Sequence, residues 1–216
     1  MDRTLFNRLA AGMVGVLSTA TTTASTVISE VLYDAAGADS GSVFVELYGP
    51  PGTSLDSMLL QGVNGGDGSV YQTVLLSGSI PADGVFVIAD DSGDGSTLVG
   101  NADLIIDVDF QNGPDSIVLR QADVVLDAIG YGDFSSAVFA GEGAAAVDAP
   151  AGSSLARFNP LLDTDDNQAD YMVLDLPTPG AVPVSAVPLP PAALLFFGGL
   201  GGLGVIARRK TGITDS

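Results

Sequence analysis

The sequence contains no cysteine, histidine or tryptophan. Histidine is the commonest general base and, with cysteine, the commonest zinc ligand, and the cysteine thiolate is a frequent nucleophile. The absence of both therefore excludes most familiar catalytic and zinc-binding constellations. It also excludes disulfides, which an exported domain does not need when its hydrophobic core is adequate.

Basic residues are scarce, and their positions say more than their number. Five of the seven lie near the two ends of the chain, so residues 25–181 contain only Arg120 and Arg157. The same region carries 24 of the 26 acidic residues, which gives it a formal net charge of −22. Because nucleic-acid affinity comes largely from lysine and arginine, we expect no nucleic-acid partner. Divalent cations are better suited to such a surface.

The first 24 residues have the three parts of a signal peptide. Arg3 and Arg8 form a positive start, residues 9–17 are apolar, and small residues lead up to Ala24. This order predicts export, with cleavage after Ala24 or, as the competing position, after Ala20. A helix of the mature fold is the alternative, but glycine and threonine suit a long helix poorly.

A second apolar stretch, residues 192–207, carries no charge. It follows the proline-rich residues 182–191 and ends at Arg208, Arg209 and Lys210. A membrane helix needs about 20 apolar residues, and a basic cluster at one end stays cytoplasmic. We therefore expect a transmembrane helix that holds the preceding domain outside the cytoplasm. Its five glycines weaken the helix and make it a poor permanent anchor.

Val187, Pro188, Leu189 and Pro190, followed by the apolar stretch and the basic cluster, resemble the VPLPA-type PEP-CTERM sorting signals. The resemblance implies that an exosortase, a membrane-embedded protease of Gram-negative bacteria, cleaves near this motif. The protein would then pass from the inner membrane to the cell surface or the exterior. Surface polysaccharide or another extracellular protein would be its partner there. A plain single-pass anchor is the alternative.

Between the two signals, short apolar runs of period two alternate with turn residues, and no long segment has helical periodicity. The pattern predicts an all-β fold, an immunoglobulin-like β-sandwich flanked by an N-terminal signal helix and the C-terminal transmembrane helix. Residues 120–123 suggest a tight hairpin. In the strand that follows, Ala128 is expected to face the core and Asp127 the opposite side. The predicted strands are residues 27–33, 43–48, 58–63, 70–76, 85–89, 104–110, 116–120 and 123–129.

Five segments of the chain stand in a characteristic order: residues 27–50 with Glu30 and Glu46, 112–132, 153–158, 163–171, and the closing Pro177, Thr178, Pro179 and Gly180. Together they resemble a lamin tail domain, an immunoglobulin-like module found in many secreted bacterial proteins. The resemblance implies one domain over residues 25–181 that acts as a non-catalytic binding or matrix module. Because such modules often accompany extracellular hydrolases, the rival is a metal-dependent hydrolase acting on phosphate esters or glycans.

Asp163, Asp165 and Asn167 stand at alternate positions of an acidic loop and could supply oxygen ligands to Ca²⁺, the one cofactor that the sequence suggests. The loop is not an EF-hand, because Gln168 and Leu174 replace the glycine and the glutamate that the EF-hand needs. A solvated acidic loop is the alternative. The acidic turn of residues 90–94 has the same two interpretations.

Glu30 and Glu46, on neighbouring predicted strands, could form a paired-carboxylate glycosidase site. The alternative, which we prefer, is that they cap loop backbone or pair with an arginine. We expect Arg120 and Arg157 each to be held by acidic side chains in bidentate pairs. The predicted organisation is a signal peptide (1–24), a β-sandwich (25–181), a linker (182–191), a transmembrane helix (192–207) and a basic cytoplasmic tail (208–216), with no catalytic residue assigned.

Overall fold

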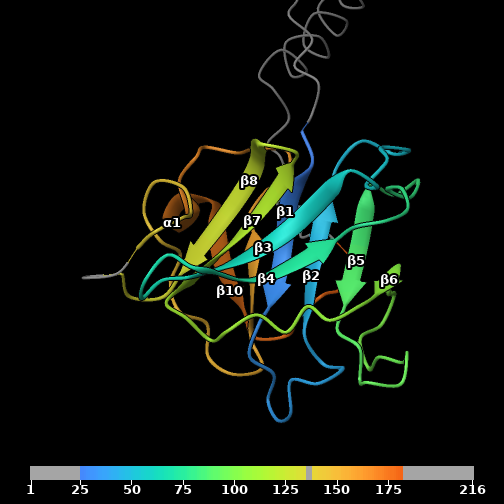
Figure 1. Cartoon of the computed structure of the whole chain (residues 1–216), viewed down its shortest axis with the longest axis horizontal. Helices are drawn as coiled ribbons and strands as arrows, with labels where there is room; N and C mark the ends of the chain where they lie inside the picture. Colours follow the sequence, from blue (N-terminus) through green and yellow to red (C-terminus); the bar gives the residue numbers. More distant parts are fainter. Residues whose placement is uncertain (1–24, 135–137, 182–216) are drawn as a thin grey trace, which may run out of the picture.

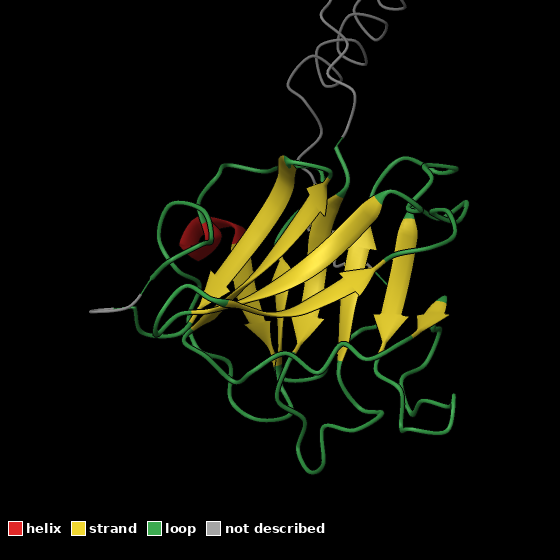
Figure 2. Cartoon of the chain, viewed as in Figure 1, coloured by secondary structure: helices red, strands yellow, loops and turns green. Residues whose placement is uncertain are grey.

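The computed structural model describes residues 25–134 and 138–181, which form two β-sheets and a single short helix, α1 (Asn167–Asp170) (Figures 1 and 2). The predicted all-β class is therefore confirmed. The predicted signal peptide, the predicted sorting motif of Val187 to Pro190, the predicted transmembrane helix and the predicted basic tail lie outside the described residues. Within those residues, no helix has the length and apolar character to span a membrane.

Six strands form one sheet in the order β10-β9-β1-β2-β5-β6, and four form the other in the order β4-β3-β7-β8. All pairings are antiparallel except that of β5 with β6. The first sheet contains β1 (Val27–Leu32), β2 (Phe44–Tyr48), β5 (Val85–Ala89), β6 (Leu104–Ile105), β9 (Ser154–Arg157) and β10 (Tyr171–Leu174). The second contains β3 (Met58–Asn64), β4 (Val70–Leu75), β7 (Asp115–Gln121) and β8 (Val124–Tyr131).

The main core lies between the two sheets, which pack face to face (Figure 1). Alternate residues of the central strands point into it, including Val45 and Leu47 from β2 and Ile117 and Leu119 from β7, all fully buried. Burial of a side chain of this size contributes about 1.5–3 kcal/mol. The inter-sheet contact is therefore the principal source of stability.

The six-stranded sheet also buries its outer face. Leu32, Phe44, Val85 and Val87 form a second apolar cluster there, and Val99 packs against them from a loop. Because both faces of β1, β2 and β5 are covered, these strands are almost continuously buried. The carboxylates of Glu30 and Glu46 therefore lie in a covered layer of the protein.

Most predicted strands lie within two residues of the observed ones. Residues 104–110 differ, because only Leu104 and Ile105 pair with β5, and the Val108 amide donates to the Asp90 side chain. The strands β9 and β10 were not predicted, since both are only four residues long and β9 contains the polar Ser154 and Arg157. The hairpin at residues 120–123 is confirmed.

The expected orientation of Asp127 is wrong. The side chain was predicted to face away from the core side of β8, but it is fully buried. Its carboxylate accepts a hydrogen bond from the Ile28 amide of the other sheet and pairs with Arg157. A charged residue that would ordinarily be solvated is thus held between the sheets by partners from distant parts of the sequence.

Candidate functional site

Arg157 is the largest fully buried side chain of the described domain and the centre of its main charged cluster. Its Nη2 atom lies 2.6 Å from Asp127 Oδ1, and its Nη1 atom lies 3.0 Å from Asp170 Oδ2 and 3.2 Å from Asp163 Oδ1. Glu142 Oε2 lies 4.0 Å from Nη2. We call Arg157 and these four carboxylates the arginine centre.

The arginine centre connects elements that are far apart in the sequence. Arg157 is on β9, Asp127 is on β8 of the other sheet, and Asp170 ends α1. The Arg157 Nε atom also donates to the Ile28 carbonyl of β1 at 3.0 Å, and the Tyr171 ring lies 4.8 Å from the guanidinium carbon. A buried charge is tolerated only where it is paired and hydrogen-bonded. Arg157 meets this condition through partners on β1, β8 and α1.

One arginine does not neutralise four carboxylates, and the pKa values of two of these acids are raised. Burial raises the pKa of Asp127 to about 6, although the Arg157 charge and the Ile28 amide oppose that rise. Burial also raises the pKa of Glu142 to about 8, and the charges of Asp127 and Asp163 add to the effect. Both effects favour the protonated form of Glu142. Its Oε2 atom is buried and, among the described residues, accepts no hydrogen bond.

The structure directs the three predicted calcium ligands to different partners. Asp163 pairs with Arg157, whereas Asp165 is exposed and donates its amide to Asp163. Asn167 is fully buried, and its Oδ1 atom accepts from the Gly130 and Glu142 amides at 2.8 and 2.9 Å. Of the three, only Asp163 joins a group of carboxylates with metal-ligand spacing.

That group consists of Asp127, Glu142 and Asp163, each offering an oxygen within 4.8 Å of the others. The guanidinium of Arg157 already stands beside it. Asp127 and Glu142 were not recognised from the sequence, because Asp127 was assigned to the solvent side of a predicted strand and Glu142 lies in an alanine- and glycine-rich loop without a motif. The one available signal was that a lone arginine in an acidic domain needs acidic partners.

The acidic turn of residues 90–94 is an ordinary turn in its hydrogen bonding. Asp90 is buried, and its carboxylate accepts from the Gly41 and Val108 amides at 2.7 and 3.1 Å. Asp91 accepts from the amides of Gly93 and Gly95, both at 2.8 Å. The Asp91 contacts are the turn-stabilising bonds that aspartate commonly makes with nearby backbone, whereas Asp90 joins the turn to two loops distant in sequence.

The expectation for the two arginines is confirmed in part for Arg157 and is wrong for Arg120. Arg157 is held by carboxylates, although its two terminal nitrogens reach different residues and form no bidentate pair. Arg120 donates to the Asp123 carbonyl at 3.1 Å, and every ion pair in the described part of the chain involves Arg157. Arg120 sits on a hairpin end, where backbone oxygens are the nearest acceptors.

Glu30 and Glu46 form a second buried site, the carboxylate pair. They stand directly opposite each other on β1 and β2, and both are fully buried on the outer face of the six-stranded sheet. Glu30 accepts hydrogen bonds from the Ser154 hydroxyl at 2.6 Å and from the Thr178 amide and hydroxyl at 2.8 and 2.7 Å. Glu46 accepts from the Ser29 hydroxyl at 2.7 Å and the Gly180 amide at 2.8 Å.

The carboxylate pair is covered by residues 177–181, which we call the strap. Asn101 supplies a further hold, because its side-chain amide donates to the Pro179 carbonyl at 2.9 Å. Gly180 has a φ of 83°, and a Cβ atom added there would lie 2.7 Å from the Asn101 Cβ. Only glycine fits this position without strain. The closing proline–glycine segment is thus fitted to the carboxylates beneath it.

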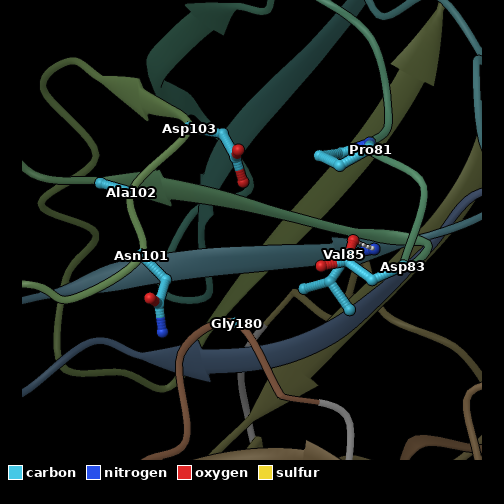
Figure 3. A pocket seen from close by; sticks show the side chains of 7 residues that line it. All are labelled: Pro81, Asp83, Val85, Asn101, Ala102, Asp103 and Gly180. Atoms are coloured by element: carbon cyan, nitrogen blue, oxygen red, sulfur yellow. Dashed lines mark hydrogen bonds between the residues drawn. The ribbon is translucent and has the colours of Figure 1, made fainter.

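A hollow of about 350 Å³ lies where the strap meets the neighbouring loops (Figure 3). Its polar lining comes from Asp83, Asn101 and Asp103, and Gly180 of the strap forms part of its wall. Both aspartates are already hydrogen-bonded to β5, Asp83 to the Val85 amide and Asp103 to the Val87 amide. The hollow is therefore an acidic surface depression that depends on the strap for one side.

No match to this chain was found among protein-family models, curated proteins or solved structures. The geometry of the two buried sites is therefore the basis for assigning a function. In the arginine centre the acids face a cation, and in the carboxylate pair they face neutral donors of the same chain.

Proposed function

We propose that this chain is an exported, exosortase-sorted protein of the cell surface or exterior. Its immunoglobulin-like, lamin-tail-like domain serves as a non-catalytic binding or matrix module. The terminal sequence patterns support the export and sorting parts of the proposal. The contacts of the carboxylate pair support the non-catalytic part.

The carboxylate pair carries the argument about activity. A glycosidase needs two carboxyl groups that flank a sugar and remain free to exchange protons with it. Glu30 and Glu46 are instead fully buried beneath the strap, and their oxygens accept hydrogen bonds from Ser29, Ser154, Thr178 and Gly180 of the same chain. These contacts favour a role in closing the domain, with partner binding left to its acidic surface.

The sorting part is tested on the sequence motif. Replacing Val187, Pro188, Leu189 and Pro190 with alanine should leave the protein in the inner membrane, where fractionation of intact cells would find it. Mass spectrometry of the surface form of the parent protein should show a chain that ends near Pro190. A surface form that still carries the Arg208 to Lys210 cluster would favour the plain anchor.

The binding part is tested by chemical cross-linking of the protein on intact cells, followed by identification of what it captures. A domain with a net charge of −22 over residues 25–181 should hold its partner through cationic groups or bridging divalent ions. Binding should therefore weaken as the salt concentration rises. Capture that is unaffected by salt would contradict an electrostatic mode.

The group formed by Asp127, Glu142 and Asp163 favours one alternative, an extracellular metal-dependent hydrolase acting on phosphate esters or glycans. A metal there would have to compete with the Arg157 guanidinium, 2.6 Å from Asp127. The test is a screen of the full chain on phosphodiester and glycoside substrates with added calcium. Turnover that Glu142→Gln and Asp163→Asn both abolish would replace our proposal with this one.

A further inference from the structure

The strap covers two acidic groups that have no cation to balance them. Glu30 and Glu46 face each other across β1 and β2, and β5 opposes Glu46 with the uncharged Val87. The strap, residues 177–181, has no ionisable side chain. Asp103, in the loop nearby, adds a further negative group, which accepts from the Val87 amide. Ion pairs in the described part of the chain all lie at Arg157, so none serves this site.

A neutral Glu46 can keep both of its contacts. Its Oε2 atom can still accept from the Gly180 amide, and a proton on Oε1 can be donated to the Ser29 hydroxyl oxygen, which then acts as the acceptor in the same 2.7 Å contact. Protonation thus keeps the strap attached while it removes one of two adjacent buried charges. Ionisation has the opposite effect, since two unbalanced carboxylates are costly beneath a cover that excludes water.

We propose that the strap is a proton-operated latch, which closes on the six-stranded sheet when Glu46 is protonated and opens when both members of the carboxylate pair are ionised. Opening exposes the two carboxylates to water and relieves their repulsion. It also removes Gly180 from the wall of the acidic hollow. The latch therefore controls whether Glu30 and Glu46, on the outer face of the six-stranded sheet, are exposed to water.

The direction of the pH dependence follows from burial. Burial raises the pKa of Glu46 to about 7, the Glu30 charge raises it further, and the Ser29 and Gly180 hydrogen bonds oppose the rise. In the open state the group is hydrated and returns to its ordinary value of about 4.5. The closed state consequently binds more protons than the open state between these values. Closure is strongest in mild acid and is progressively lost as the pH rises to about 7.

The latch acts where the described domain continues into the proposed linker and sorting segment. If the proposed sorting is correct, the closed latch fixes the start of that segment on the sheet, whereas the open latch leaves it detached from the sheet. This consequence rests on the proposed function. The latch itself does not, because it is defined by contacts within residues 25–181 and can be measured without any sorting enzyme.

The latch is tested by hydrogen exchange in the full chain, with the Thr178 and Gly180 amides as reporters. After correction for intrinsic exchange, their opening ratio should rise about tenfold per pH unit between pH 5 and 7. Glu46→Gln, which mimics the neutral acid, should remove this slope, whereas Asp56→Asn, an exposed acid elsewhere, should leave it unchanged. A slope that persists in Glu46→Gln, or no slope in the parent, would overturn the proposal.

A second reporter does not depend on amide exchange. Because the sequence has no tryptophan, Ala181→Trp places a single indole at the exposed end of the strap. Its emission should change with a midpoint set by Glu46, and Glu30→Gln should move that midpoint to lower pH by removing the neighbouring charge. An unchanged midpoint in Glu30→Gln would contradict a latch that works by repulsion. Loss of surface sorting with the latch intact would instead fault the proposed function alone.

Discussion

The arginine centre and the carboxylate pair both bury acidic side chains, but they stabilise them differently. Around Arg157, the guanidinium, which also donates to the Ile28 carbonyl, holds several carboxylates between the two sheets. Around Glu30 and Glu46, hydroxyls and amides do this work, and two of those amides belong to the strap. The arginine centre therefore depends on one cationic side chain, whereas the carboxylate pair depends on neutral donors and on the segment that covers it.

The largest expected effect is loss of the cation. Arg157→Met should destabilise the domain by about 3–5 kcal/mol, because it leaves Asp127 and its neighbours buried without a partner. Urea unfolding of the full chain, followed by circular dichroism, measures the loss. Arg120→Met is the matched control and should change stability by no more than about 0.5 kcal/mol. Equal effects of the two substitutions would show that the arginine centre is not essential to the fold.

The next effect is a pH dependence that both regions share. The raised pKa values of Asp127, Glu142 and Glu46 mean that the folded chain binds more protons than the unfolded chain between about pH 4.5 and 8. Stability should therefore fall as the pH rises through 5, 6, 7 and 8. Urea midpoints at these values test the trend, and a midpoint that rises with pH would contradict it.

Substitutions of Glu142 and Glu46 separate the contributions of the two regions to the pH dependence of stability. Glu142→Gln should flatten the part near pH 8, because Glu142 in the arginine centre has the highest of the three pKa values. Glu46→Gln should reduce the slope between about pH 4.5 and 7 and leave the part between pH 7 and 8 unchanged. If either variant removed the whole dependence, the two sites would have to be coupled.

Removal of an acceptor from the carboxylate pair should have a smaller effect than loss of Arg157. Glu46→Ala leaves the Ser29 hydroxyl and the Gly180 amide without their partner, at a cost of about 1–3 kcal/mol. Glu46→Gln keeps an acceptor for Gly180 and should cost less than Glu46→Ala at pH 7. Thermal melting at constant pH compares the two, and equal melting temperatures would mean that the hydrogen bonds contribute little.

Gly180→Ala tests the fit of the strap, and the chain offers a matched control. Gly95 has a φ of 82°, close to the 83° of Gly180, but a Cβ atom at Gly95 would meet no atom within 4 Å. Gly95→Ala therefore reports the backbone cost alone, about 1–2 kcal/mol. Gly180→Ala should cost more, since its Cβ atom would lie 2.7 Å from that of Asn101. Equal losses of stability in the two variants would indicate that the strap shifts to accommodate the added Cβ atom.

The smallest expected effect is that of calcium. Asp163 is already paired with Arg157, and the side chain of Asn167 is committed to the Gly130 and Glu142 amides. Millimolar calcium should therefore leave the melting temperature of the full chain nearly unchanged. A clear upward shift that Asp163→Asn removes would restore the predicted calcium site.

The sequence pattern was sufficient for the strands whose apolar residues recur at short range. Residues 85–89 were predicted with the bounds that β5 has, because a short continuous apolar run between turn residues is typical of a buried strand. It was insufficient for β9 and β10, whose four residues each pair only through distant partners. Residues 104–110 were predicted as one strand, but only Leu104 and Ile105 pair with a neighbouring strand. An alternating pattern alone does not show whether such a neighbour exists.

The sequence by itself determined the all-β class, the acidic character and the exclusion of histidine and cysteine chemistry, because these follow from composition and local periodicity. It also indicated that Arg157 needs acidic partners. Only the tertiary structure decided which ones, because Asp127, Glu142 and Asp170 approach Arg157 across both sheets and α1. It likewise placed Thr178 and Gly180 over Glu30 and Glu46, contacts between residues more than 130 positions apart that no local pattern encodes.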